Sequence, residues 1–404
     1  MSQQNLLTPS IITKESLVIL ENNLVAANRI NRKFENQFVK IGNQLTIRKP
    51  NRFTVASGAG LNVQNIAEPS VTITVNQQKH VDFQFTSQDL TLTVEEFSER
   101  YLKPSMASLA NQVDNDVLAN TPAFSNFVGT PTVTPAAFSS SVQLVGRRMD
   151  ENAAPQDNRS LVLNPAAYWA MAGGQVGLFV MPTAKEALVK GYLATLGNYE
   201  IYMDQNVFTQ STAAHNSAVA FNITTAQGNG NTTTIWGGSA VDTIAIGEVF
   251  TVAGVFNCNP QSRLTTGVLK NFVVTGTSQT NTSWVITFSP SLVTSGPYQN
   301  ATGPVTGTGG TMSTGAALTW LTGTSTAQIG AVNNLSFTRD SMGLVMVPME
   351  IPQGVDFAAR ENYRNISMRV IRAYDINNDV FPTRIDILYG TAVYYDELAC
   401  RLGG

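Results

Sequence analysis

The chain has 404 residues, of which 43% are hydrophobic and 13% are charged, and its formal net charge is -3. This length is enough for two or three domains, and the hydrophobic share places the chain among soluble globular proteins. The net charge gives no overall reason to bind nucleic acid. The charged share is about half the usual one, which suits a protein that hides much of its surface against partners.

Cysteine usage and the apolar pattern exclude further classes of protein. Cys258 and Cys400 lie far apart with no C-x-x-C spacing, so we expect neither a zinc site nor a disulfide framework, and we infer a reducing compartment. No apolar run approaches 18 residues, and the N-terminus lacks a basic region followed by an apolar one. We therefore expect no membrane span and no secretion signal.

The first segment reads as an arm. Residues Ile11 to Phe38 carry a helical pattern, with Leu17, Leu20 and Leu24 on one side. Between Met1 and Thr54 eight basic residues stand against three acidic ones. In the latter half of the arm these basic residues could face a polyanion, while a solvated or intersubunit face fits equally well. They are Arg29, Arg32, Lys33, Lys40, Arg48, Lys49 and Arg52.

After the arm, apolar and polar residues alternate along the chain, as they do in strands. A short strand at Gln44 to Arg48 ends at Lys49-Pro50, and Gly58 and Gly60 make the next stretch loose. Two strands on either side of a turn at Asn76 to Lys79 are then predicted to form a long hairpin. Because a lone hairpin is marginal in water, we expect it to pack on something else, such as another subunit. Its apolar positions are Val71, Ile73 and Val75, then Val81, Phe83 and Phe85.

The stretch Leu92 to Leu118 is predicted to be one long helix. Thr93 and Glu96 form a T-x-x-E capping box, and an apolar stripe recurs at spacings of three and four residues. Pro104 removes one helical amide, so we expect a kink there.

Helices and strands then mix, which predicts an α+β layer structure. Thr134 and Pro135 are expected to begin a helix, and Asn164-Pro165 another that runs through Met171. The other predicted elements are a buried strand at Leu161 to Leu163, a helix at Lys185 to Leu196 and a strand at Tyr199 to Met203.

The composition changes at about Phe221. Only four charged residues occur from Asn222 to Thr338, in a background rich in Thr, Gly, Ser and Asn. Short strands bounded by turn residues predict a small all-β domain, inserted in the chain. These strands are Glu248 to Val255, Leu269 to Thr275 and Ser283 to Phe288. From Leu335 the mixed pattern resumes, with strands at Met368 to Ala373 and Thr383 to Tyr389 and a last element that ends at Leu402.

No motif predicts catalysis, a cofactor or a metal. His80 and His215 have no partner at ligand spacing, and Asp114 and Asp116 fall on different helix faces. The run Asp375-x-Asn377-x-Asp379 opens like an EF-hand loop but lacks the glycine at its sixth position. We therefore expect a protein that is not an enzyme.

Five long segments, in order along the chain, resemble the major capsid (coat) proteins of P22-like tailed bacteriophages. They are "VILENNLVAANRINRKF", "IGNQLTIRKPNRFTV", "VDFQFTSQDLTLTVEEFSERYLKPSMASLANQVDND", "GEVFTVAGVFNCNPQSRLTTGVLKNFVVT" and "VDFAARENYRNISMRVIRAYDINNDVFPTRIDILYG".

The resemblance implies an α+β subunit of the HK97-like major capsid fold. Its parts would be an N-terminal arm at 1–50, an extended loop at 51–91, a peripheral domain at 92–155 with a spine helix at 93–119, an axial domain beginning at 156–221, an inserted β domain at 222–334 and a C-terminal part at 335–404.

The family's function implies the partners. Copies would assemble as hexamers and pentamers, with a scaffolding protein and around a portal, into an icosahedral precursor shell in the bacterial host cytoplasm. The shell would expand as double-stranded DNA is packaged, and the arm and spine helix would face the interior. There Arg29, Arg32, Lys33 and Lys40 could meet DNA phosphates without reading sequence, or could contact another subunit.

Two other classes of function compete with this one. The Thr/Ser/Asn-rich β domain could recognise a glycan, but Trp236, Trp284 and Trp320 are scattered in sequence rather than clustered as a stacking platform needs. An enzyme would need an acid, base or metal constellation, and no motif supplies one.

Overall fold

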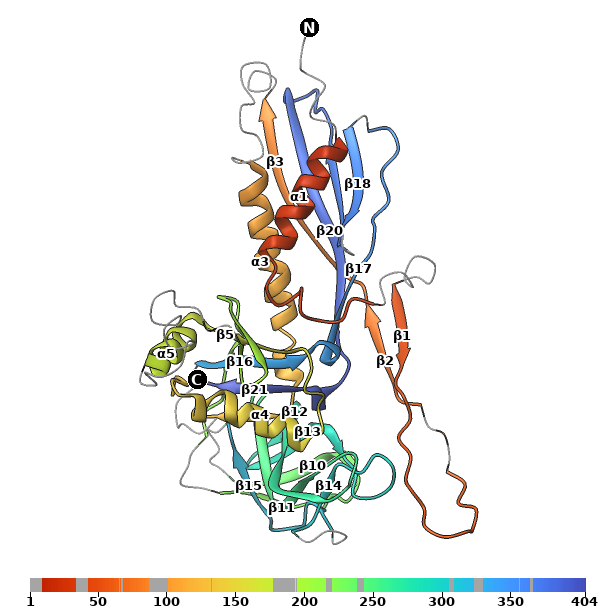
Figure 1. Cartoon of the computed structure of the whole chain (residues 1–404), viewed down its shortest axis with the longest axis vertical. Coiled ribbons are helices and arrows are strands. Elements are labelled where there is room, and N and C mark those ends of the chain that lie inside the picture. The colour runs from red at the N-terminus through yellow and green to blue at the C-terminus, as the bar shows by residue number, and fades with distance from the viewer. Residues whose placement is uncertain are drawn as a thin grey trace. The chain divides into compact units, whose positions relative to one another are not determined.

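The computed structural model describes residues 9–33, 43–86, 101–176, 193–215, 220–237, 243–304, 309–322 and 330–404, except 65, 67, 132, 194, 356, 364 and 365. The chain divides into two compact units. Unit 1 comprises Met1–Arg48, Ser70–Val117 and Met342–Ala392, and unit 2 comprises Lys49–Pro69, Leu118–Ser341 and Val393–Gly404. Both contain helices and strands, as predicted (Figure 1).

Unit 1 is built on a five-stranded sheet in the order β17-β20-β19-β18, with β3 also paired to β20. Helix α1 packs against β18 and β19 (Figure 1). A separate pair of strands, β1 and β2, is antiparallel. The elements are α1 (Pro9–Asn23), β1 (Gln44–Arg48), β2 (Ser70–Thr74), β3 (Gln77–Thr86), α3 (Lys103–Leu118), β17 (Met342–Met346), β18 (Phe357–Tyr363), β19 (Ile366–Arg372) and β20 (Val380–Val393).

A buried carboxylate fixes the register of the central strand β20. Asp386 accepts a bidentate pair of hydrogen bonds from Arg369 of β19, at 3.0 and 2.6 Å, and another from Arg384 at 3.1 Å. Asp386 is fully buried, so removing its arginine partners would leave an uncompensated carboxylate in the interior. Its neighbours Ile385 and Ile387 are also fully buried.

The predicted hairpin of β2 with β3 is wrong. β2 pairs instead with β1, from Ser70 opposite Arg48 to Thr74 opposite Gln44. β3 pairs antiparallel with β20, from Gln77 opposite Tyr389 to Thr86 opposite Val380. The predicted two-residue period is present, but the partners come from elsewhere in the chain. The apolar face of β3 finds a longer partner in the fourteen-residue β20 than the five-residue β2 could offer.

The arm helix is shorter than predicted. α1 ends at Asn23, and the chain after it is held by Asp114 of α3, whose carboxylate accepts hydrogen bonds from the amides of Val25 and Ala27 at 2.6 and 2.8 Å. Residues 24–33 are described and are not helical, so the predicted helix is wrong there, and residues 34–42 lie outside the described part. Asp116 contacts different groups, accepting from Tyr389 at 2.6 Å and pairing with Lys79 at 3.0 Å.

The long helix is described from Lys103 to Leu118. The part of its predicted apolar stripe from Met106 to Val117 is confirmed, because Met106, Leu109, Val113 and Val117 are buried, whereas Tyr101 is 43% exposed. Pro104 lies in the first turn of α3, where a missing amide costs little. The predicted cap residues Thr93 and Glu96 lie outside the described residues, so the expected kink is untested.

Unit 2 contains a mixed sheet in the order β4-β21-β16-β5-β7-β6, with β8 paired to β16. Its elements are η3 (Thr121–Ala123), β4 (Phe127–Gly129), η4 (Phe138–Ser140), α4 (Val142–Glu151), β5 (Arg159–Leu163), α5 (Pro165–Val176), β6 (Thr195–Leu196), β7 (Tyr199–Met203), β8 (Thr209–Ser211), β16 (Gly330–Thr338), η5 (Arg339–Ser341), η6 (Asp396–Leu398) and β21 (Ala399–Gly403).

Some of the predicted boundaries in unit 2 hold and others move. The Asn164 side chain accepts a hydrogen bond from the amide of Ala167, which confirms the predicted start of α5. Thr134 and Pro135 do not begin a helix, since the first helical turn there is η4 and α4 begins at Val142. The end of the helix predicted at Lys185 to Leu196 is strand β6, and residues 185–192 lie outside the described part.

The inserted β domain, defined here by β9 to β15, is a closed barrel within unit 2. Its strands follow the order β12-β13-β10-β9-β15-β11-β14, and β11 also pairs with β12, which closes the ring. The core is aromatic and includes Trp284 and Trp320, both nearly buried. The strands are β9 (Phe221–Ile223), β10 (Gly230–Trp236), β11 (Val249–Cys258), β12 (Thr265–Thr280), β13 (Ser283–Leu292), β14 (Ala301–Thr302) and β15 (Ala317–Trp320).

Candidate assembly surfaces

A group of exposed apolar side chains belongs to the segment that joins β1 to β2. This extended segment comprises residues 49–69. Its apolar side chains are far more exposed than the occasional surface leucine of a globular protein, and they occur close together. The exposed fractions are 61% for Phe53, 99% for Val55, 93% for Leu61, 77% for Val63 and 71% for Ile66.

A single glutamine ties the two sides of the extended segment together. The Gln64 side chain accepts a hydrogen bond from the amide of Thr54 at 2.7 Å and donates one to the carbonyl of Thr54 at 2.5 Å. The tip beyond this pair turns through Gly58, which has a φ of 99° that L-residues rarely adopt. No atom lies within 4 Å of where a Cβ of Gly58 or Gly60 would be, so the tip has room around it.

The predicted intersubunit hairpin residues do not form an exposed surface. Ile73 is fully buried and Val75 nearly so. Val71, Val81 and Phe83 are half-buried, and the side chain of Phe85 lies outside the described residues. The exposed apolar surface lies some twenty residues upstream instead. A sequence signal for it exists, because apolar residues alternate at 53 and 55 and again at 61 and 63, on either side of the two glycines.

The predicted basic residues of the arm differ in exposure. Arg29 and Lys33 are exposed to solvent. Arg32 is 9% exposed, and its guanidinium donates to Asn28 at 3.3 Å, so its charge is turned into the unit. Lys40 lies outside the described residues. Of the four residues expected to meet DNA phosphates or another subunit, Arg29 and Lys33 are therefore the described ones that are exposed.

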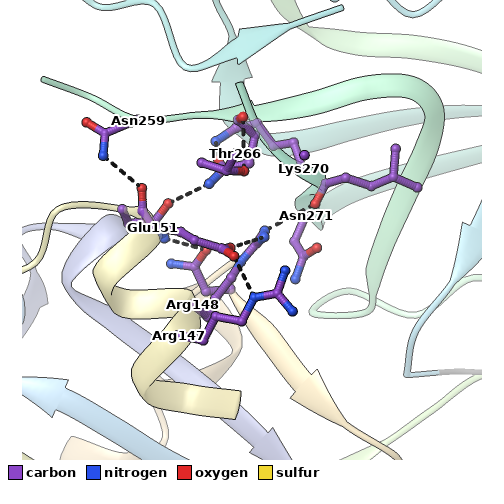
Figure 2. A network of polar contacts seen from close by, with 12 residues as sticks. Arg147, Arg148, Glu151, Asn259, Thr266, Lys270 and Asn271 are labelled. Atoms are coloured by element: carbon purple, nitrogen blue, oxygen red, sulfur yellow. Dashed lines mark hydrogen bonds and ion pairs between the residues drawn. The ribbon is translucent and has the colours of Figure 1, made fainter. Parts of the chain in front are cut away.

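A network of polar contacts seats the inserted β domain on α4 (Figure 2). Arg148 of α4 is buried and donates to the carbonyl of Leu269 at 3.4 Å, while Arg147 pairs with Glu151 at 2.8 Å. From the inserted domain, Asn259 donates to the carbonyl of Glu151 at 3.3 Å. A cavity of about 660 Å³ beside these residues is lined by both parts.

Within this network, buried amides form a chain in which each donates to the next. Lys270 of β12 donates to the Asn257 side chain at 3.4 Å, and Asn257 donates to Asn152 at 2.8 Å. Asn152 donates to Asn126 at 3.0 Å, and Asn126 donates to the carbonyl of Ala399 at 3.0 Å. Such aligned chains polarise one another. Burial lowers the pKa of Lys270 to about 8, against the opposing pull of nearby carboxylates.

His215 lies in a loop after β8, and its side chain is buried in the core. It is nearly buried and contacts both oxygens of the fully buried Glu248 at 3.2 Å. Its ring stacks on Trp320 with 4.6 Å between centroids. Within the described residues no cluster of three or more His, Cys, Asp or Glu could hold a metal ion. In the same part of the chain, no helix is both long and apolar enough to cross a membrane.

A comparison with known families gives one match over nearly the whole chain. The sequence model of the family described as "P22 coat protein - gene protein 5" matches residues 1–402. No curated protein matches the sequence.

Solved structures resemble the chain in fold at low sequence identity. A chain of Mycobacterium phage Che8 is 12% identical with a TM-score of 0.51, and the match covers 94% of this chain and 90% of that one. The capsid of Ralstonia phage GP4 is 8% identical with a TM-score of 0.47, covering 93% and 86%. Mycobacterium phage Ogopogo is 9% identical with a TM-score of 0.43, covering 94% and 91%. The Che8 likeness shows the HK97-like capsid fold.

Proposed function

Because the chain belongs to the P22 coat protein family and is a major capsid protein of a homo-oligomeric shell, we propose that the extended segment holds neighbouring copies together in that shell. The observation that carries this proposal is the exposure of Val55, Leu61, Val63 and Ile66 in the single chain. Contacts between a protruding segment and a different surface of the next copy are heterologous, and heterologous contacts that close build rings and shells.

The exposed side chains are large enough to matter energetically. Fully burying one aliphatic side chain contributes about 1.5–3 kcal/mol, so four of them could supply roughly 6–12 kcal/mol before the cost of ordering the segment. A shell needs only modest contacts between each pair of copies, because every copy has several neighbours. These four side chains can therefore supply an apolar contact between copies.

The test is a double substitution at the tip, Val55→Ser with Leu61→Ser. Since both side chains are almost fully exposed, we expect the subunit to keep its circular dichroism spectrum and thermal midpoint while shells disappear from negative-stain micrographs. Ile376→Ser is a matched control, because Ile376 is 79% exposed but lies in the turn before β20. Normal shells from the double variant would refute the proposal.

We also propose that Arg29 and Lys33 face the packaged double-stranded DNA. Both are exposed, and counterion release gives phosphate contacts a favourable, salt-dependent free energy without sequence reading. Arg29→Gln with Lys33→Gln should leave empty shells intact but lower the salt concentration at which filled particles lose their genome. Arg147→Gln, at an exposed arginine of α4, is the control for a lost charge. Unchanged salt resistance would assign these residues to a solvated or intersubunit face.

The remaining steps follow the family's pattern. We propose that copies assemble in the host cytoplasm with a scaffolding protein, around a portal, as a precursor shell that expands when DNA enters. The domain limits given above, including the inserted domain at 222–334, are part of this proposal. Expression with and without a candidate scaffolding protein, followed by negative-stain microscopy, tests it: irregular particles in both cases would count against a scaffolded route.

A further inference from the structure

The first residues of the extended segment, 49–53, are called its root here. The root is anchored to the C-terminal part of unit 2. The Arg52 guanidinium makes a bidentate pair with the carboxylate of Glu397, with one of the two bonds at 3.2 Å. The Lys49 ammonium lies 4.8 Å from the centre of the Tyr395 ring. Burial lowers the pKa of Arg52, but its hydrogen bond to Glu397 and its attraction to the charges around it together leave the pKa raised. The ion pair of Arg52 and the cation–π contact of Lys49 thus hold the root against the C-terminal residues of unit 2.

The inserted β domain contacts the same root from two of its loops. The Tyr298 hydroxyl, between β13 and β14, donates a hydrogen bond to the Asn51 side chain at 3.0 Å. The Arg263 guanidinium, between β11 and β12, donates to the carbonyl of Phe53 at 2.9 Å. These contacts fall on residues just before the Thr54–Gln64 pair. Both loops therefore meet the segment where it leaves its root and before its apolar tip begins.

Hydrogen bonds within the loop that carries Arg263 hold this residue in place. The Asn259 side chain accepts hydrogen bonds from the amides of Gln261 and Ser262, at 2.9 and 3.1 Å, and the Arg263 amide donates to the Asn259 carbonyl at 2.8 Å. Arg263 has a φ of 58°, in the left-handed region that disfavours residues with a Cβ. A glycine would suit this backbone better, so the side chain is kept at a conformational cost, as at functional positions.

We propose that the inserted β domain acts as a bracket within its own subunit, with Tyr298 and Arg263 setting the direction in which the extended segment leaves its root. This inference rests on the proposed role of the tip in joining copies. A segment held at one angle offers its tip to the next copy without first losing conformational freedom, so the bracket speeds assembly by preorganisation. Such preorganisation matters most for a long segment with few packing contacts of its own, because that segment would otherwise lose the most conformational freedom on assembly.

The bracket variant is Tyr298→Phe with Arg263→Gly in the full chain. The first change removes one hydroxyl, and the second removes the guanidinium while relieving the backbone, so neither should unfold the inserted β domain. The matched control is Asn281→Gly with Tyr202→Phe. Asn281 has a φ of 55° in the turn between β12 and β13, and Tyr202 loses a hydroxyl that bonds Glu200 at 2.6 Å, both away from the segment.

The first measurement is hydrogen exchange of unassembled subunits by mass spectrometry. Losing two hydrogen bonds at the root should speed exchange of the amides at 51–57 by roughly tenfold, while exchange in the barrel strands stays unchanged. The control variant should exchange like the wild type. Equal exchange at 51–57 in the bracket variant and the wild type would show that the inserted domain does not hold the segment.

The second measurement is the rate of shell assembly, followed by light scattering at equal subunit concentration. We expect the bracket variant to assemble several-fold more slowly than the wild type and the control. Faster exchange with an unchanged assembly rate would overturn the bracket alone. The tip variant Val55→Ser/Leu61→Ser keeps the two proposals apart, since normal assembly of that variant would instead overturn the role of the tip.

Discussion

At the residue scale, Lys270 is unusual because it is a buried lysine whose hydrogen-bond partner is an amide rather than a carboxylate. It is one of four charged residues between 222 and 338, and the sequence offered no sign that it would be buried. Its hydrogen bond is to an amide oxygen at 3.4 Å, while Asp396 and Glu397 act on it only through space. A drop in pKa from 10.5 to about 8 corresponds to about 3 kcal/mol of lost stability at neutral pH.

The sign of this effect makes it testable. Between pH 8 and 10.5 the unfolded chain holds the Lys270 proton more tightly than the folded chain does, so the free energy of unfolding should rise with pH in that window. Lys270→Met should raise it by about 2 kcal/mol at pH 7, after the loss of the bond to Asn257, and the gain should shrink toward pH 10. Denaturant titrations of both proteins at several pH values measure the difference; an equal pH dependence in both would contradict it.

At the element scale, the sequence predicted strands better than it predicted their partners. The two-residue period placed β2, β3, β19 and β20 within a few residues of their observed bounds, because period depends on local burial. The predicted pairing of β2 with β3 was wrong because the residues between the two strands were interpreted as a hairpin turn. The partner of β3 lies some 300 residues away, where ten residues of β20 match its length.

The starts of helices were also predicted only in part from local sequence. Asn164 was predicted as a cap and acts as one, since its side chain meets the amide of Ala167 within the same turn. Pro135 was predicted to begin a helix, but the chain first makes the short turn η4, and α4 begins seven residues later at Val142. The alternation at 53, 55, 61 and 63 likewise marks apolar positions but could not show that they are exposed, because exposure depends on which surfaces the rest of the chain leaves uncovered.

At the scale of the whole molecule, the inserted β domain was predicted from its low content of charged residues. The structure gives a reason to expect that this domain can fold independently. Every strand from β9 to β15 pairs only within the set, and the ring closes on itself. β16, by contrast, pairs with β5, β8 and β21, so a fragment that ends at the predicted domain limit, residue 334, would carry an unpaired strand. The barrel's own limit is near Thr322, whose hydroxyl accepts from the Val249 amide at 2.9 Å.

We therefore predict that residues 221–322, expressed alone, fold as a soluble monomeric β domain with a free energy of unfolding of about 5–10 kcal/mol. Trp284 and Trp320 should fluoresce as buried residues, and Lys270, freed from α4, should regain a pKa near its ordinary value. The matched control is residues 221–311, which lack β15 and so leave β9 and β11 unjoined. A disordered spectrum for the longer fragment would mean that the barrel is stable only when seated on α4.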